Sequence, residues 1–284
     1  LAPAFVIGGI VNNFAGNYRL GTGPFIVLEG DEYDTAFFDK GPKFLHYPAH
    51  LAVLTGVEFD HADIYRDLAH VQSAFERFVA SLAPEARLLA ASGQENLPPV
   101  LKAGRCGILR YGWGVDDDWA IGKVSIVPPW TGFEVLRRGR PHAEFRTKMM
   151  GEHNLTNILA AAAVADAVGI APADVDSALE SFAGVRRRQE IRGVKNGVTV
   201  MDDFAHHPTA VRETIRAVRP FFPGGRVIAV FEPRTNSSMR QVFQQIYPGC
   251  FDGADLICIR KPPLLSKIPE GERFSSETLV ADLK

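Results

Sequence analysis

Short aliphatic runs alternate with helical segments through the last third of this chain. The pattern predicts strands at residues 198–201, 227–231 and 256–259, with helices at 208–218 and 237–247 between them. A strand, a helix and another strand in this order favour a parallel sheet, because antiparallel neighbours can be joined by a short turn. The chain is therefore predicted to have an α/β fold.

The earlier part mixes strands, helices and hairpins. It predicts buried strands at residues 25–28, 51–54 and 87–90, and an amphipathic helix at 67–82. Residues 105–147 have the alternation and the glycine and proline content typical of hairpins. This mixture is compatible with a further α/β domain.

A domain boundary is predicted near Gly184, after an alanine-rich helix at residues 154–168 and a second helix that opens near Pro172. A charged strand from Arg187 to Arg192 and a hairpin turn at Asn196-Gly197 follow it. A length of 284 residues suits two domains. We expect one at residues 1–185 and one at 186–284.

The composition excludes several classes of protein. The formal charge of −2 gives no basic face for nucleic acid, and no apolar run reaches the roughly 20 residues of a membrane helix. Three cysteines lie far apart without metal-type spacing, so we expect a reducing, cytoplasmic location. Because the chain opens with Leu1 in a strand-like pattern and stops at Lys284 in a helix-like one, we interpret it as part of a longer protein.

Two polar strings follow predicted strands and are candidates for metal chemistry. Residues 29–34, Glu-Gly-Asp-Glu-Tyr-Asp, hold four carboxylates that repel one another and could bind Mg²⁺, although a solvated acidic turn is an equal alternative. Residues 60–63, Asp-His-Ala-Asp, follow another strand, so His61 could reach the same crevice as Glu29. The alternative for this pair is a helix cap or a core histidine.

Two further strings suit nucleotide or carboxylate chemistry. Asn154 and Asn157 share a helix face, and their amides suit an adenine edge, with simple capping as the alternative. Residues 202–208, Asp-Asp-Phe-Ala-His-His-Pro, place two acids and two histidines between a strand and a helix. Upstream, residues 186–188 provide three arginines for a phosphate, unless they form a solvated strand edge.

Taken together and in this order, the four strings resemble the Mur ligase family, with Arg-Arg-Arg-Gln-Glu between the last two. The resemblance covers nearly the whole chain. It implies a UDP-sugar-binding domain, a central ATPase domain with a P-loop-type sheet, and a Rossmann-like C-terminal domain. It also implies a reaction in which ATP converts a carboxylate into an acyl-phosphate, which an amine then attacks to form an amide.

The resemblance also implies roles for individual residues. Glu29 and His61 are expected to hold Mg²⁺, and Asn154 and Asn157 to contact the adenine of ATP. Arg187 or Arg188, together with Asp202, is expected to contact ATP from the C-terminal domain. The remaining expected site residues act on the reacting groups or hold the substrates: His206 and His207 near the carboxylate or amine with Arg188 as a catalytic partner, and Arg234, Asn236 and Asp203 on the substrate.

Within the family, residues 30–40, 57–64 and 231–237 favour the branch that joins the tripeptide L-Ala-γ-D-Glu-meso-diaminopimelate to UDP-N-acetylmuramate. Three other functions stay open: the branch that adds L-alanine, a non-catalytic module that binds a precursor, and a metal-dependent hydrolase built on Glu29 and His61. An arginine fork at Arg234 suits a peptide carboxylate.

The sequence departs from the family pattern in one main respect. No P-loop occurs, because Gly122-Lys123 lacks the upstream glycine and has Val124 at the hydroxyl position. We expect the P-loop and the UDP-sugar domain to lie upstream of Leu1, and this chain alone to be inactive. Gly56 also stands where relatives have asparagine, which affects one expected substrate contact.

Overall fold

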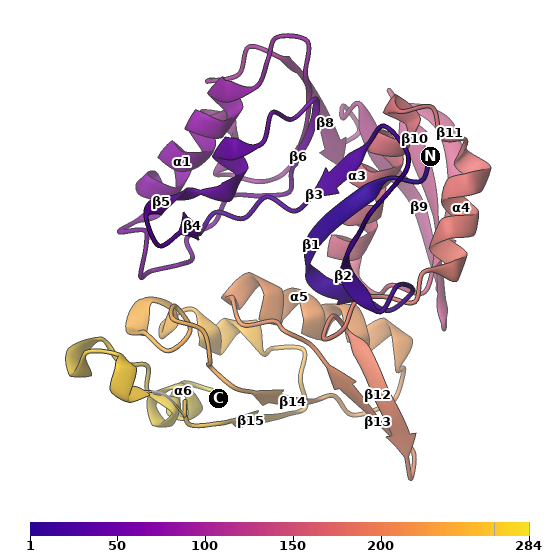
Figure 1. Cartoon of the computed structure of the whole chain (residues 1–284). Helices are drawn as coiled ribbons and strands as arrows, with labels where there is room; N and C mark the ends of the chain where they lie inside the picture. Colours follow the sequence, from indigo (N-terminus) through magenta and orange to yellow (C-terminus); the bar gives the residue numbers. More distant parts are fainter. Residues whose placement is uncertain (264, 284) are drawn as a thin grey trace.

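The largest sheet has six strands, in the order β11-β10-β9-β8-β7-β6, in the computed structural model, which describes residues 1–263 and 265–283 (Figure 1). Strands β6 to β9 are parallel, whereas β9, β10 and β11 form antiparallel hairpins. The strands are β6 (Leu51–Leu54), β7 (Arg87–Ala91), β8 (Gly107–Gly112), β9 (Trp119–Val127), β10 (Trp130–Arg137) and β11 (Arg140–Thr147). The predicted α/β class and the hairpin region are confirmed.

Four helices accompany this sheet: α1 (Leu68–Ser81), α2 (Leu97–Leu101), α3 (Glu152–Ala167) and α4 (Pro172–Ser181). Helix α1 begins where it does because the side chain of Asp67 accepts a hydrogen bond from the backbone of His70 at 2.8 Å. It buries Val71, Phe78 and Val79 against the sheet, as the amphipathic pattern predicts. Helix α3 is buried along much of its length and carries both candidate asparagines.

A separate sheet at the N-terminus has the order β2-β1-β3, with β1 (Ala4–Val11), β2 (Gly16–Arg19) and β3 (Ile26–Leu28). The prediction of a strand at residues 25–28 is confirmed, but its predicted burial is wrong. Ile26 and Val27 are 58% and 54% exposed, because β3 pairs only with β1 and its side chains line a cavity. The hairpin β4 (Asp34–Ala36) and β5 (Asp39–Pro42) and the turn η1 (Lys43–His46) follow.

The described residues after Gly184 have a hydrophobic core of their own, and we call them the second part. The strand pairs are β12 (Glu190–Lys195) with β13 (Val198–Asp202), antiparallel, and β14 (Ile228–Phe231) with β15 (Leu256–Ile259), parallel. The helical elements are α5 (Pro208–Val218), η2 (Arg219–Phe221), η3 (Gln241–Phe243), η4 (Tyr247–Cys250), η5 (Leu265–Lys267), η6 (Glu270–Glu272) and α6 (Ser276–Asp282). The predicted bounds of α5 and β15 agree with the structure.

Two predictions in this part are wrong in detail. Residues 237–247 form turns and the short 3-10 helix η3 rather than one α-helix, because Arg240 is extended and bridges Arg273, while the Ser238 hydroxyl bonds to Thr235. The charged strand begins at Glu190 rather than Arg187. Arg187 and Gln189 have φ angles of 57° and 50°, a left-handed conformation that cannot continue a strand.

The two parts contact each other through Phe59, which packs against both hydrophobic cores. Figure 1 shows the second part lying across the ends of α3 and the N-terminal sheet. Gly184 is tied to β1 because its carbonyl accepts the amide of Asn12 at 3.0 Å. Within the described residues, no helix is both long and apolar enough to cross a membrane.

Candidate active site

A cavity of about 2380 Å³ lies between the two parts of the chain. Its walls include β3, β6 and α3 from the first part and the loops that precede β12 and α5 from the second. Six of the sequence-predicted site residues line it: Glu29, Asn154, Asn157, Arg188, Asp203 and His207. The fold therefore brings together residues that lie up to 178 positions apart, counting from Glu29 to His207.

Glu29 stands at the end of β3 and its side chain faces the neighbouring strand β1. One carboxylate oxygen, Oε2, accepts the backbone N–H of Gly8 at 2.5 Å. A Cβ on Gly8 would lie only 3.3 Å from the Glu29 oxygens, so glycine lets the carboxylate approach the backbone. The other oxygen remains available to a ligand in the cavity.

His61 does not line this cavity and instead pairs with Glu32. Its Nε2 lies 3.1 Å from Glu32 Oε1, and its ring lies 5.3 Å from the ring of Tyr33. The hydrogen bond with Glu32 raises the pKa of His61, and partial burial opposes the shift. With a φ of 50°, the backbone of His61 is left-handed, so the side chain is directed by an uncommon conformation. Glu29 therefore lines the cavity, whereas His61 lies outside its lining and is paired with Glu32.

The asparagines of α3 differ in how much of their bonding capacity is free. The side-chain amide of Asn154 donates to the Met150 carbonyl at 2.8 Å and to Gln189 Oε1 at 3.1 Å. That second bond joins α3 to the second part of the chain and leaves the Asn154 oxygen free. Asn157 is exposed, and its side chain makes no hydrogen bond within residues 1–263 and 265–283. Asn157 can therefore both donate to and accept from a ligand.

The arginines before β12 are arranged around Phe204. The guanidinium groups of Arg187 and Arg188 lie 4.9 and 5.6 Å from the centre of its ring. Arg187 also lies 3.6 Å from Asp202, whereas Arg188 reaches the cavity. Both cations therefore lie beside the Phe204 ring, and only Arg188 lines the cavity.

Asp203 has a local structural role that its position in the sequence did not indicate. Its two oxygens each accept a backbone N–H at 2.7 Å, from Gln189 and from Ala205. These bonds hold the left-handed turn before β12 and fix the loop before α5. Asp203 therefore positions Gln189, and through it Asn154.

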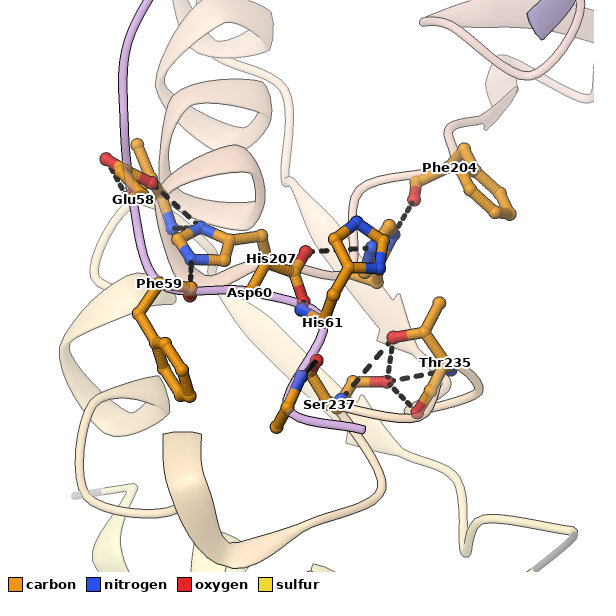
Figure 2. Close-up of polar contacts among 12 residues, drawn as sticks. Glu58, Phe59, Asp60, His61, Phe204, His207, Thr235 and Ser237 are labelled. Carbon is orange, nitrogen blue, oxygen red and sulfur yellow. Dashed lines mark hydrogen bonds and ion pairs between the residues drawn. The ribbon is translucent and has the colours of Figure 1, made fainter. Parts of the chain in front are cut away.

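Both histidines of residues 202–208 bind residues 58–60 of the first part (Figure 2). Nδ1 of His207 lies 3.0 Å from Glu58, and its Nε2 donates to the Phe59 carbonyl at 3.2 Å. Nε2 of His206 lies 3.7 Å from Asp60. Burial alone would raise the pKa of Asp60, but His206 and Ser237 outweigh it and hold that pKa well below its usual range. We call these contacts the histidine seam.

The loop after β14 extends the contact between the parts. Asn236 donates to Asp63 at 2.8 Å, and the hydroxyl of Ser237 accepts the backbone N–H of Ala62 at 3.0 Å. Arg234 is exposed and makes no ion pair among the described residues. Asn236 thus lies on the inter-part contact, while Arg234 is free to meet a ligand.

Sequence reasoning missed two partly buried residues beside the asparagines. Nδ1 of His153 and Nε2 of Gln189 are buried and find no hydrogen-bond partner in the described part of the chain. Both residues line the cavity. His153 adjoins Asn154 in the sequence, which was a usable signal; nothing in the sequence placed Gln189 there.

Replacing His153 by glutamine is expected to weaken the dependence of the free energy of unfolding on pH below pH 6.5. Burial lowers the pKa of His153 below its ordinary value of 6.5. Below pH 6.5 the unfolded chain therefore binds a proton that the folded chain does not, so the free energy of unfolding falls with falling pH. Urea unfolding at several pH values measures the slope. The exposed His50→Gln variant serves as the control, and an unchanged slope in His153→Gln contradicts the assignment.

The site fits a nucleotide better than a metal held by protein alone. No cluster of three or more His, Cys, Asp or Glu side chains suited to a metal occurs within the described ranges. Mg²⁺, however, often uses one or two carboxylates together with waters and substrate phosphates. Glu29, the free asparagine groups, the orphaned His153 and Gln189 atoms and Arg188 offer such a mixed environment.

Comparisons with known proteins match both parts of the chain. A family model described as the Mur ligase middle domain matches residues 23–165, and one described as the Mur ligase glutamate ligase domain matches residues 187–267. The UDP-N-acetylmuramate–L-alanyl-γ-D-glutamyl-meso-2,6-diaminoheptandioate ligase of Escherichia coli K12 is 41% identical over 92% of this chain and 56% of its own length.

Two solved structures of Mur ligases are also similar to this chain. A ligase of the same description from Neisseria meningitides has 36% identity and a TM-score of 0.60 over 66% of this chain and 59% of its own. A MurF ligase from Thermotoga maritima, solved with ADP, has a TM-score of 0.73 over 95% of this chain and 63% of its own. At 17% identity, the second likeness shows the fold alone.

Proposed function

The chain belongs to the Mur ligase family, and from this premise we propose that its full-length gene product is an ATP-dependent amide ligase. The proposed substrates are UDP-N-acetylmuramate and the tripeptide L-Ala-γ-D-Glu-meso-diaminopimelate, as the name of the Escherichia coli relative indicates for that protein. The chain spans 56% and 58% of the length of the two curated relatives with this description. The activity is therefore proposed for the full-length gene product.

The cavity between the two parts is the observation that carries this proposal. A ligase of this kind must hold a nucleotide, a carboxylate and an amine together, away from water. Here Glu29 and Asn157 from the first part share one cavity with Arg188 and His207 from the second. The amide of Asn157 and the guanidinium of Arg188 are both exposed toward this space and can therefore bind a ligand there.

In the proposed complex, Asn154 and Asn157 contact the adenine. Asn157 has both a donor and an acceptor free, while Asn154 offers its oxygen because its amide is held by Met150 and Gln189. Arg188 meets the phosphates from the second part, and Arg187 with Asp202 supports it. Contacts from both parts would couple nucleotide binding to their relative position.

Bound ATP would supply the phosphoryl group that converts the UDP-N-acetylmuramate carboxylate into an acyl-phosphate, leaving ADP, and Mg²⁺ would offset the charge of the phosphates. Glu29 and His61 are the proposed protein ligands of the ion. Glu29 keeps one oxygen free for this role. His61 must leave Glu32 or use its other ring nitrogen, because Nε2 is paired in the structure.

The proposed roles at the reacting end follow from the histidine seam. His206 and His207 would lie beside the carboxylate and the attacking amine, where an imidazole can accept the proton that the amine loses. Arg234 and Asn236 would hold charged groups of the peptide, and Asp203 keeps the loop in place through its two backbone bonds. We also propose the domain boundary at residues 185/186 and a cytoplasmic location, where ATP is available.

A phosphate-release assay on the full-length gene product tests the proposal. UDP-N-acetylmuramate and ATP are supplied with either the diaminopimelate tripeptide or L-alanine, and the product is identified by mass. We expect release with the tripeptide to exceed release with L-alanine by at least about 100-fold in kcat/KM, since an incomplete substrate loses binding energy. Preference for L-alanine would support the alanine-adding branch, and no release with either amine would support a non-catalytic binder.

A further inference from the structure

A second pocket, of about 530 Å³, lies between the β4–β5 hairpin and helix α1. In Figure 1 this hairpin and helix lie side by side, on the flank of the first part nearest the turns of the second. The residues of this pocket that carry charge or a polar ring are Asp34, Lys40, Asp63, Tyr65, His70 and Arg77. None of them lines the large cavity, so the proposed function leaves this pocket without a role.

The charges of the pocket are of both signs and are not fully paired. Lys40 is 2.6 Å from Asp34 and neutralises it. The guanidinium of Arg77 has no ion-pair or hydrogen-bond partner in the portion of the chain that the structure covers, and Asp63 meets only the neutral amide of Asn236. An unpaired guanidinium and an unpaired carboxylate in one pocket match a ligand with a carboxylate and an ammonium group.

The pocket lies next to the proposed reaction site. Asp63 is two residues from His61, so their Cα atoms are at most about 7 Å apart. The hydroxyl of Tyr65 donates to the backbone carbonyl of Glu32, the residue that pairs with His61. Asn236, from the loop that also carries Arg234, reaches the pocket at Asp63.

The short separation of His61 and Asp63 suits a peptide whose first residue reacts near His61 and whose third residue enters the pocket. In an extended α-linked chain, the third residue lies about 7 Å from the first, and the γ-linkage of D-Glu lengthens this span. A peptide whose amine lies at the histidine seam could pass the loop of Arg234 and place its third side chain in the pocket. That side chain, in meso-diaminopimelate, ends in a free carboxylate and a free ammonium group.

We propose that this pocket, through Arg77 and Asp63, binds the free α-amino-acid end of the third residue of the tripeptide. Arg77 binds the carboxylate and Asp63 the ammonium group, while Arg234 serves the carboxylates nearer the reacting amine. The inference rests on the proposed function and deepens it by assigning the residues that select the third amino acid. It predicts that a lysine-containing peptide, which lacks the distal carboxylate, is a poorer substrate.

The test compares two tripeptides in the full-length gene product, one ending in meso-diaminopimelate and one in L-lysine. Wild type is expected to favour the first in kcat/KM. Arg77→Ala should reduce this preference by about tenfold or more, through a higher KM for the diaminopimelate peptide alone, since charge-assisted hydrogen bonds are worth that much. KM for ATP and the Tm should not change, because the Arg77 side chain is exposed.

Two further variants sharpen the result. Arg77→Lys keeps the charge and should retain part of the preference. Arg66→Ala removes an exposed arginine just before α1 that does not line the pocket, and this variant should retain the full preference for the diaminopimelate peptide. A wild-type enzyme that ligates both peptides equally, or an Arg77→Ala variant with unchanged preference, overturns this inference and leaves the ligase activity standing. A wild-type protein that ligates neither peptide overturns the proposed function as well.

Discussion

Replacing Glu29 by glutamine is expected to lower ligase turnover of the full-length gene product by about 100-fold, which corresponds to about 3 kcal/mol of lost transition-state stabilisation. The carboxylate is proposed to bind Mg²⁺ and so to offset the charge that develops on the transferred phosphate. Glutamine has nearly the same shape, and its amide oxygen can still accept the Gly8 N–H that Glu29 accepts now. The fold should therefore survive, and the loss should fall on turnover.

The matched control is Glu85→Gln, which removes an exposed carboxylate outside both pockets. Phosphate release at saturating substrates measures turnover, and circular dichroism checks the fold. Raising the Mg²⁺ concentration should recover part of the Glu29→Gln activity, because a weakened site is filled by mass action. Turnover within twofold of wild type would contradict the metal role of Glu29.

Replacing Tyr247 by alanine is expected to destabilise the second part of the chain by about 4 kcal/mol, because a large buried ring is lost and a cavity remains. Tyr247 is fully buried, with ring centres of Phe231, Phe243 and Phe274 at 5.0, 6.0 and 5.8 Å. Its hydroxyl donates to the backbone carbonyl of His206 at 2.6 Å, and burial raises its pKa far above the usual range. The same side chain thus supports both the core and the histidine seam.

The control here is Tyr247→Phe, which keeps the ring contacts and removes only the hydroxyl. It should cost about 1 kcal/mol, the value of one net hydrogen bond. Urea unfolding followed by near-ultraviolet circular dichroism measures both variants. A loss below about 1 kcal/mol in Tyr247→Ala would show that the aromatic cluster does not hold this part together.

Local patterns predicted the regular elements of the fold well. Helix α5 matches its predicted bounds because Pro208 is well suited to the first turn of a helix and the apolar positions recur on one face. The turn at Asn196-Gly197 forms as predicted, with both residues at positive φ. The helix predicted at residues 237–247 does not form, because the bridge from Arg240 to Arg273, 33 positions later in the sequence, overrides their helix-like spacing.

The candidate site was predictable only in part. The polar strings identified residues such as Glu29, Asn157 and Arg188, and the fold places these in one cavity. The partners of the histidines were not predictable, because Glu58 and His207 meet only when the two parts pack together. Nor did the sequence show that His61 would pair with the nearby Glu32.

The central claim is that one nucleotide is held by both parts of the chain across the large cavity. A crystal structure of the full-length gene product with Mg²⁺ and a non-hydrolysable ATP analogue tests this most directly. We predict the adenine against Asn157, the phosphates within reach of Arg188, and the metal ion on Glu29. A nucleotide bound elsewhere, or one contacted by residues of only one part, would contradict the account.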